Sequence, residues 1–225
     1  MQMTVKDAAK ALQVAEKTVY RWIQSGGLPA YRVAGQYRIN RAMLFDWATS
    51  KRINFSPEAN QKVQENAPLP SLATALQDGG IHYRVGGTAK ADVLKAVVGL
   101  LKVPDHVDRD FLYQALLARE QLQSTGIGDG IALPHVRNPA LLETPTASIC
   151  LCFLETAVDY AALDGKPVNT LFIPLSPDVR THLHLLSRIS FALRDPQFKA
   201  VLAAEGRRDE ILEAARAAAP EEPQA

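Results

Sequence analysis

The fold of this chain is decided by residues 119–139, which have the sequence R-E-Q-L-Q-S-T-G-I-G-D-G-I-A-L-P-H-V-R-N-P. Three glycines stand within five positions here, which is typical of backbone that adopts positive φ or lies close to a ligand. Residues 131–133, Ile-Ala-Leu, then predict a short buried strand that Pro134 ends. We therefore expect His135 at a rigid corner directly after a strand.

A helix is expected just before the glycines, over residues 111–123. Its predicted buried stripe consists of Leu112, Ala115, Leu116 and Leu122. Arg119 falls on this stripe, and a guanidinium among apolar residues either extends to solvent or meets a buried anion. Ser124, Thr125 and free N–H groups of the glycine loop add further donors. An arginine clamp, hydroxyls and one imidazole together predict that His135 accepts a phosphoryl group.

The run R-E-x-L-x-S-T-G-I-G-x-G-I-A-x-P-H resembles the active-site signature of the EIIA proteins of the bacterial phosphotransferase system. It is most similar to the fructose/mannitol type and especially to the nitrogen-regulatory branch. A looser resemblance extends over residues 72–217. It implies that His135 is transiently phosphorylated. Relatives commonly have glycine after this histidine, whereas Val136-Arg137 follow here, and this departure predicts a changed preference for donor or acceptor.

The resemblance also implies a second active-site histidine at the start of a later helix, where Thr181-His182-Leu183 matches the family pattern T-H-L. Helical geometry separates two candidates there. His182 shares an apolar stripe with Leu185, Leu186, Ile189 and Leu193, whereas His184 does not. We expect His182 to point inward and to hydrogen-bond the phosphoryl oxygens or steady His135. A packed structural histidine is the open alternative. His82 and His106 carry no supporting pattern.

Residues 1–53 predict a small winged helix-turn-helix domain. Helical spacing covers residues 4–12 and 16–24, a hairpin is expected over 28–39, and a third helix over 41–49. The patterns T-V-x-x-A-A-x-x-L-x-V, T-V-Y-R-W-I-x-x-G-x-L-P-A and Y-R-I resemble the excisionase/MerR-like family. The expected DNA contacts on the second helix and the wing are Lys17, Thr18, Arg21, Gln24, Arg32, Gln36, Tyr37 and Arg38. The alternative is a small helical module whose basic face is merely solvated and contacts no DNA.

The charge distribution supports two modules with different partners. Residues 1–55 contain nine basic and three acidic residues, a net charge of +6. The whole chain has a net charge of only +1, so residues 56–225 carry −5. A basic module is therefore joined to an acidic one. A single helix-turn-helix offers a modest interface, so tight specific DNA binding is expected to need a homodimer or adjacent sites.

The remaining chain predicts an α/β domain with a mixed sheet and helices on both faces, over residues 72–218. A polar, proline-containing linker is expected at 54–71 and a disordered tail at 219–225. Cys150 and Cys152 alternate in a strand pattern and are expected to be small core hydrophobes. Two thiols are too few for a structural zinc site, and no metal or cofactor is expected. No run is apolar enough to span a bilayer, so we expect a cytoplasmic protein.

These observations favour a regulatory phosphocarrier that takes a phosphoryl group from an HPr-like carrier and couples its phosphorylation to DNA binding or protein interaction. Such a chain forms a covalent phosphohistidine and then passes the phosphoryl group on, so whether to class it as an enzyme stays open. One alternative is a transcription regulator whose EIIA-like half is a sensor scaffold. Another is a sugar-specific EIIA that donates phosphate to an EIIB partner.

Overall fold

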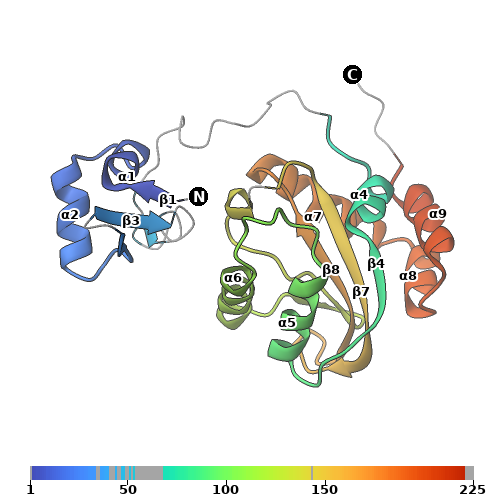
Figure 1. Ribbon diagram of the computed structural model, residues 1–225. Coiled ribbons are helices and arrows are strands. Elements are labelled where there is room, and N and C mark those ends of the chain that lie inside the picture. The colour runs from blue at the N-terminus through green and yellow to red at the C-terminus, as the bar shows by residue number, and fades with distance from the viewer. Residues whose placement is uncertain are drawn as a thin grey trace. The chain divides into compact units, whose positions relative to one another are not determined.

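The structure is a computed structural model that describes residues 2–33, 36–40, 44, 47, 48, 51, 53, 68–142 and 144–220. The chain divides into two compact units, residues 1–66 and 67–225, and each is described by itself (Figure 1). The linker expected at 54–71 and the tail expected at 219–225 lie largely outside the described residues. Those bounds stay predictions.

The described residues of the N-terminal unit form two short helices and a small antiparallel sheet. Its elements are β1 (Gln2–Thr4), α1 (Val5–Ala11), α2 (Glu16–Gln24), β2 (Tyr31–Val33) and β3 (Gln36–Asn40). The strands have the order β1-β3-β2. Thr4 and Asp7 form a capping box: the Thr4 hydroxyl accepts from the Asp7 N–H at 3.1 Å, and the Asp7 carboxylate accepts from the Thr4 N–H at 2.9 Å. The predicted helix pair and hairpin are confirmed. The third helix expected over 41–49 lies largely outside the described residues.

Strand β1 was not predicted, because three residues carry too little pattern to indicate a strand. It is defined by pairing, with Met3 opposite Ile39 of β3. Val5, Val19 and Ile39 are buried together with the alanines of α1. The wing strand β3 is therefore tied to the start of the helix pair by a shared core.

The C-terminal unit is an α/β domain with one five-stranded mixed sheet. Its helices are α4 (Leu72–Gly79), α5 (Lys90–Leu100), α6 (Arg109–Leu122), α7 (Val179–Ala192), α8 (Pro196–Ala203) and α9 (Arg208–Ala218), with a 3₁₀ turn at Pro139–Leu142. Its strands are β4 (Ile81–Val85), β5 (Gly126–Gly128), β6 (Ile131–Ala132), β7 (Ser148–Val158) and β8 (Val168–Leu175). The strand order is β4-β7-β8-β6-β5, and the pairs β4–β7 and β6–β8 are parallel. The predicted mixed sheet is confirmed.

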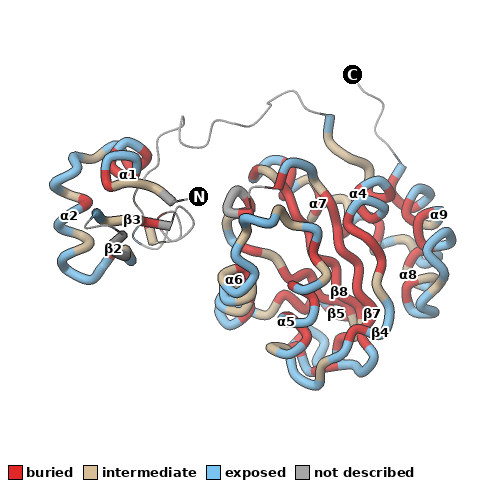
Figure 2. The backbone as a smooth tube through the Cα atoms, viewed as in Figure 1, coloured by how far each residue is buried: buried red, intermediate tan, exposed pale blue. Residues whose placement is uncertain are grey.

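Strict alternation along β7 produces two apolar cores, one on each face of the sheet. Ile149 and Leu151 face the core shared with α4, α7, α8 and α9, whereas Cys150 and Cys152 face the core shared with α5 and α6. Both cysteines are completely buried, as predicted, with their sulfurs 3.7 Å apart. Figure 2 shows the strands as the buried layer between helices whose outer surfaces are exposed. A sheet covered on both faces explains why β7 is almost continuously apolar.

Two local expectations around the glycines were wrong. Leu122 is 67% exposed, and Glu120 is buried with Leu112 and Leu116. Positions 112, 116 and 120 repeat every four residues on one helical face, and 122 lies off it. Residues 126–128 form the edge strand β5 rather than a loop, because they pair antiparallel with β6.

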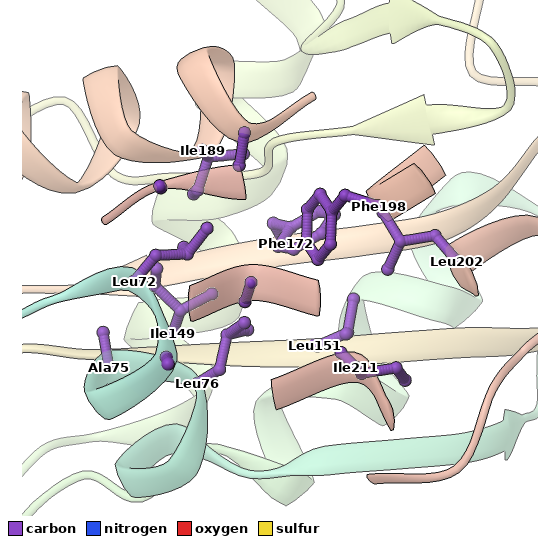
Figure 3. Packing of buried hydrophobic residues seen from close by; sticks show 14 of the residues in the cluster. Leu72, Ala75, Leu76, Ile149, Leu151, Phe172, Ile189, Phe198, Leu202 and Ile211 are labelled. Carbon is purple, nitrogen blue, oxygen red and sulfur yellow. The ribbon is translucent and has the colours of Figure 1, made fainter. Parts of the chain in front are cut away.

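We predict that Phe198→Ala lowers the unfolding free energy of the C-terminal unit by about 3–5 kcal/mol. Phe198 is completely buried between α8 and the sheet, near Phe172 and Leu202 (Figure 3). Urea unfolding followed by far-UV circular dichroism measures the loss.

The matched control is Phe191→Ala, because the Phe191 side chain is 52% exposed and its loss should cost no more than about 0.5 kcal/mol. The only tryptophans, Trp22 and Trp47, belong to the N-terminal unit, so their fluorescence transition should not move in either variant. Equal destabilisation by the two substitutions would contradict the predicted packing.

Candidate functional site

The pairing of β6 with β8 determines where the predicted site residues meet. The two strands are parallel, with Ile131 opposite Thr170 and Ala132 opposite Leu171. Chain segments that follow parallel neighbours emerge at the same end of a sheet. His135 follows β6, and α7 with His182 follows β8. Strand β5 runs antiparallel to β6, so the end of α6 that precedes β5 also lies at this end.

The two histidines are neighbours there although they are 47 positions apart in the sequence. Their ring centroids are 5.3 Å apart, with an angle of 47° between the planes. His135 is half-buried, and His182 is only 6% exposed. The prediction that His182 points inward is confirmed. The Nε2 atoms of both rings make no hydrogen bond to any residue in the described part of the chain.

The proton position on His135 follows from its hydrogen bond. Its Nδ1 lies 2.8 Å from the carbonyl oxygen of Leu133, and a carbonyl can only accept. Nδ1 therefore carries the proton, and Nε2 has the free lone pair of a nucleophile. The Leu133 N–H donates in turn to the carbonyl of Thr125 at 3.0 Å, so the corner that carries His135 is tied to the strand beside it.

Both imidazoles are held in their neutral form. Burial lowers the pKa of His135, and the nearby Arg119 charge lowers it further, against opposing contributions from the Leu133 hydrogen bond and from Glu120. Burial, with a smaller contribution from the charge of His135, lowers the pKa of His182 to about 4. A neutral His135 is the form that can attack an electrophile.

Arg119 lies in the last turn of α6, half-buried. Its Nη1 donates to the carbonyl of Gln123 at 2.8 Å, which holds the guanidinium against the C-terminal end of its own helix. Its charge is close enough to lower the pKa of His135. An anion bound at Nε2 of His135 would therefore lie in the field of this guanidinium.

The hydroxyls of Ser124 and Thr125 are both used within the protein. The Ser124 hydroxyl donates to the carbonyl of Tyr160, and the Thr125 hydroxyl donates to the carboxylate of Glu120. That carboxylate also accepts from the Thr125 N–H at 3.1 Å and from the Nζ of Lys90 at 3.0 Å. Glu120 thus holds Thr125, the residue directly before β5. The Thr125 carbonyl in turn accepts from the Leu133 N–H.

Glu120 and Lys90 were missed by the sequence reasoning. A buried glutamate looks like an ordinary helix residue in sequence. Its only signal was the four-residue spacing from Leu112 and Leu116. A buried carboxylate needs a cation and several donors, and here Lys90 and Thr125 supply them.

The glycines of β5 and its turn serve packing and backbone conformation. A Cβ on Gly126 would lie 2.8 Å from the Cβ of Ala162, so only glycine fits. Gly128 and Gly130 have φ values of 102° and 75°. The Gly126 N–H donates to the Ser124 hydroxyl at 3.0 Å, so it is not one of the free donors expected from the sequence.

The departure after His135 has a packing explanation. Val136 is 2% exposed and belongs to the apolar core that faces α5 and α6. Its side chain anchors the corner in a way that glycine could not. Arg137 is exposed. Of the other histidines, His184 bonds through Nε2 to the carbonyl of Pro70 at 3.0 Å, away from the site.

The expected DNA-contact residues form an exposed face in the N-terminal unit only in part. Lys17, Arg21 and Gln24 are exposed on α2, and Thr18 is half-buried. On the wing, Gln36 is exposed, Tyr37 and Arg38 are half-buried, and the side chain of Arg32 lies outside the described residues. The ring of Tyr37 lies 6.0 Å from that of Tyr20 on α2. This contact connects the wing with the helix expected to enter the major groove.

The mixed sheet and its helices form an EIIA-type fold. Residues 74–217 match the family described as the phosphoenolpyruvate-dependent sugar phosphotransferase system, EIIA 2, and the chain belongs to that family. Residues 3–52 match a helix-turn-helix domain. The resemblance stated from the sequence is therefore confirmed for both units.

Among its relatives, the chain is 37% identical to the nitrogen regulatory protein of Pseudomonas aeruginosa, a match that covers 54% of this chain and 79% of the relative. It is 38% identical to the nitrogen regulatory protein of Escherichia coli, and that match covers 55% of this chain and 76% of the relative. The fold is similar to the crystal structure of nitrogen regulatory protein IIA-Ntr from Neisseria meningitidis, with a TM-score of 0.53, 28% identity, and coverage of 60% of this chain and 92% of that one. The chain is thus a member of the EIIA family that resembles nitrogen regulatory proteins.

Two features are absent from the described residues. They contain no helix that is both long and apolar enough to cross a membrane. They also contain no group of three or more His, Cys, Asp or Glu side chains arranged to hold a metal ion.

We predict that His182 makes the protein less stable as the pH falls. In the unfolded chain His182 takes up a proton near its ordinary pKa of 6.5, whereas in the fold it does so only near about 4. Between these values the unfolded state binds more protons, so the unfolding free energy decreases as the pH is lowered. His182→Gln should flatten this decrease in urea unfolding measured from pH 7 to pH 5. His106→Gln, which removes an exposed histidine, is the control. Identical pH slopes in the two variants would contradict the prediction.

Proposed function

We propose that the chain is a regulatory phosphocarrier that accepts a phosphoryl group on Nε2 of His135 from the phosphohistidine of an HPr-like carrier. The observation that carries the proposal is a pair of neutral imidazoles whose ring centroids are 5.3 Å apart. His135 is held through Nδ1, and its Nε2 is free to attack. The similarity to nitrogen regulatory proteins favours regulation over sugar uptake.

In the transfer step the lone pair of His135 Nε2 forms a bond to phosphorus while the nitrogen–phosphorus bond of the donor breaks. The donor imidazole keeps that electron pair. No general base is required, because Nε2 carries no proton. The transition state is loose, so alignment and charge stabilisation matter most.

The surrounding residues would stabilise the transferred group. Arg119 would neutralise the equatorial oxygens, and His182 would contact them through Nε2. Ser124 and Thr125 would act indirectly, by fixing the start of β5 through their bonds to Tyr160 and Glu120. Arg119 would thus supply preorganised charge, and the neutral His182 a hydrogen-bonding contact, where the phosphoryl group arrives.

The helix-turn-helix unit would let the phosphorylation state of the chain affect DNA binding. We propose that it binds DNA through the exposed face of α2 with Lys17, Arg21 and Gln24, while Gln36 and Arg38 of the wing contact the backbone. Phosphorylation adds close to two negative charges to the C-terminal unit. That charge would change DNA binding or the contact with a target protein.

A second candidate function is donation of the phosphoryl group to an EIIB partner. The observation that favours it is the 31% identity to the fructose-specific EIIABC component of Bacillus subtilis, over 59% of this chain. Transfer of label from the phosphorylated chain to an added EIIB domain would support it.

We predict that incubation with a phosphorylated HPr-like carrier adds one phosphoryl group to the chain and that His135→Ala abolishes this. Intact-mass spectrometry at neutral or alkaline pH, where phosphohistidine survives, measures the stoichiometry. In the same assay Arg119→Ala should slow transfer about tenfold to a hundredfold, through loss of one charged donor.

His106→Ala is the matched control and should accept phosphate as the wild type does, because His106 is exposed and outside the site. Stoichiometric labelling of the His135→Ala protein would refute the acceptor assignment. Wild-type transfer rates in the Arg119→Ala protein would refute only the clamp.

We predict that the full chain binds a random-sequence DNA duplex and that replacing both Lys17 and Arg21 by Gln weakens this binding. Two lost phosphate contacts should reduce the slope of log affinity against log salt by about two. Fluorescence anisotropy over a salt series measures the slope. The control is Lys95→Gln, which neutralises an exposed lysine of α5.

The same titration with phosphorylated protein tests the coupling. A wild type that binds no duplex in either state would refute the DNA-binding proposal. Equal binding by both states would refute only the switch.

A further inference from the structure

The histidines of the site are held by chemically different partners. The Nδ1 of His135 faces a backbone carbonyl, and the Nδ1 of His182 lies 3.2 Å from the hydroxyl oxygen of Ser176. A carbonyl accepts only, whereas a hydroxyl can donate or accept. The tautomer of His135 is therefore determined by its partner, but that of His182 depends on which way the Ser176 proton points.

Ser176 is positioned for this contact by the end of β8. It follows Leu175, the last residue of the strand, and it is completely buried. The segment from Ser176 to His182 is held by Asp178, which caps α7: its carboxylate accepts from the Thr181 N–H at 2.8 Å and from the Thr181 hydroxyl at 2.7 Å. The serine oxygen and the imidazole are thus fixed in relation to one another.

Hydrogen-bond requirements at the site select one direction for the hydrogen bond between Ser176 and His182. If Nδ1 of His182 carried the proton, Nε2 would present a lone pair to the phosphoryl oxygens, and the two would repel. If Nδ1 accepts from Ser176, the proton is on Nε2, which can donate to those oxygens. Only the second arrangement makes a neutral His182 useful beside a phosphohistidine.

We propose that Ser176 is a positioning residue that donates its hydroxyl proton to Nδ1 of His182 and so keeps Nε2 of that ring protonated as a donor to the phosphoryl group on His135. This inference rests on the proposed function for its purpose. Its structural part, the tautomer of His182, does not.

The experiment is ¹⁵N NMR of the full-length protein labelled at histidine, at pH 7.5. Long-range ¹H–¹⁵N spectra distinguish the two neutral tautomers, the chain contains only five histidines, and His182→Gln assigns the signal. The expected wild-type spectrum has His182 protonated on Nε2. Ser176→Ala should convert it to averaged shifts from a mixture of tautomers, and Ser176→Thr, which keeps the hydroxyl, should retain the wild-type pattern.

Phosphoryl transfer from the HPr-like carrier provides the second readout. Ser176→Ala should slow it about three- to tenfold, the effect of one lost hydrogen bond, and Ser176→Thr should restore it. Ser187→Ala, an exposed serine on α7, should change neither rate nor spectrum. A merely structural effect of the alanine would slow transfer without changing the His182 tautomer.

Two results would overturn the proposal: a wild-type His182 protonated on Nδ1, or an unchanged His182 tautomer in the Ser176→Ala protein. The wild-type spectrum decides even where Ser176→Ala fails to fold. Failure of the proposed function is a separate outcome. In that case the wild-type spectrum shows the predicted His182 tautomer, but His135 accepts no phosphoryl group.

Discussion

The site depends on the parallel pairing of a two-residue strand with the long strand beside it. Strand β6 is too short to hold its position alone, yet its alignment with β8 places the residues after both strands at one end of the sheet. His135 and His182 approach each other for this reason. The antiparallel edge strand β5 then brings the end of α6, with Arg119, to the same place.

An ion pair between the buried Glu120 and the half-buried Lys90 supports that geometry. The carboxylate of Glu120 satisfies the N–H and hydroxyl of Thr125 while Lys90 balances its charge. Breaking such a pair leaves an uncompensated charge in an apolar core, which is costly. The start of β5 is therefore held tightly, and through the Leu133 N–H this fixes the corner from which His135 extends.

The two imidazoles show how similar groups can fit the different roles proposed for them. Burial keeps both neutral at physiological pH, so neither role depends on a charged ring. What differs is the partner of Nδ1. A carbonyl forces one tautomer on His135 and leaves a nucleophilic nitrogen, whereas the Ser176 hydroxyl permits the opposite tautomer on His182.

The sequence by itself determined the two-unit organisation, the helix pair, the alternation of β7 and the signature ending at His135, because these depend on local periodicity and on residues close together in the chain. It indicated the inward face of His182 for the same reason. Only the tertiary structure decided that Glu120 is buried in place of Leu122, that residues 126–128 pair as a strand, and that Ser176 contacts His182. Those features depend on contacts between distant segments. Periodicity shows which face of an element is buried, but it does not show what that face meets.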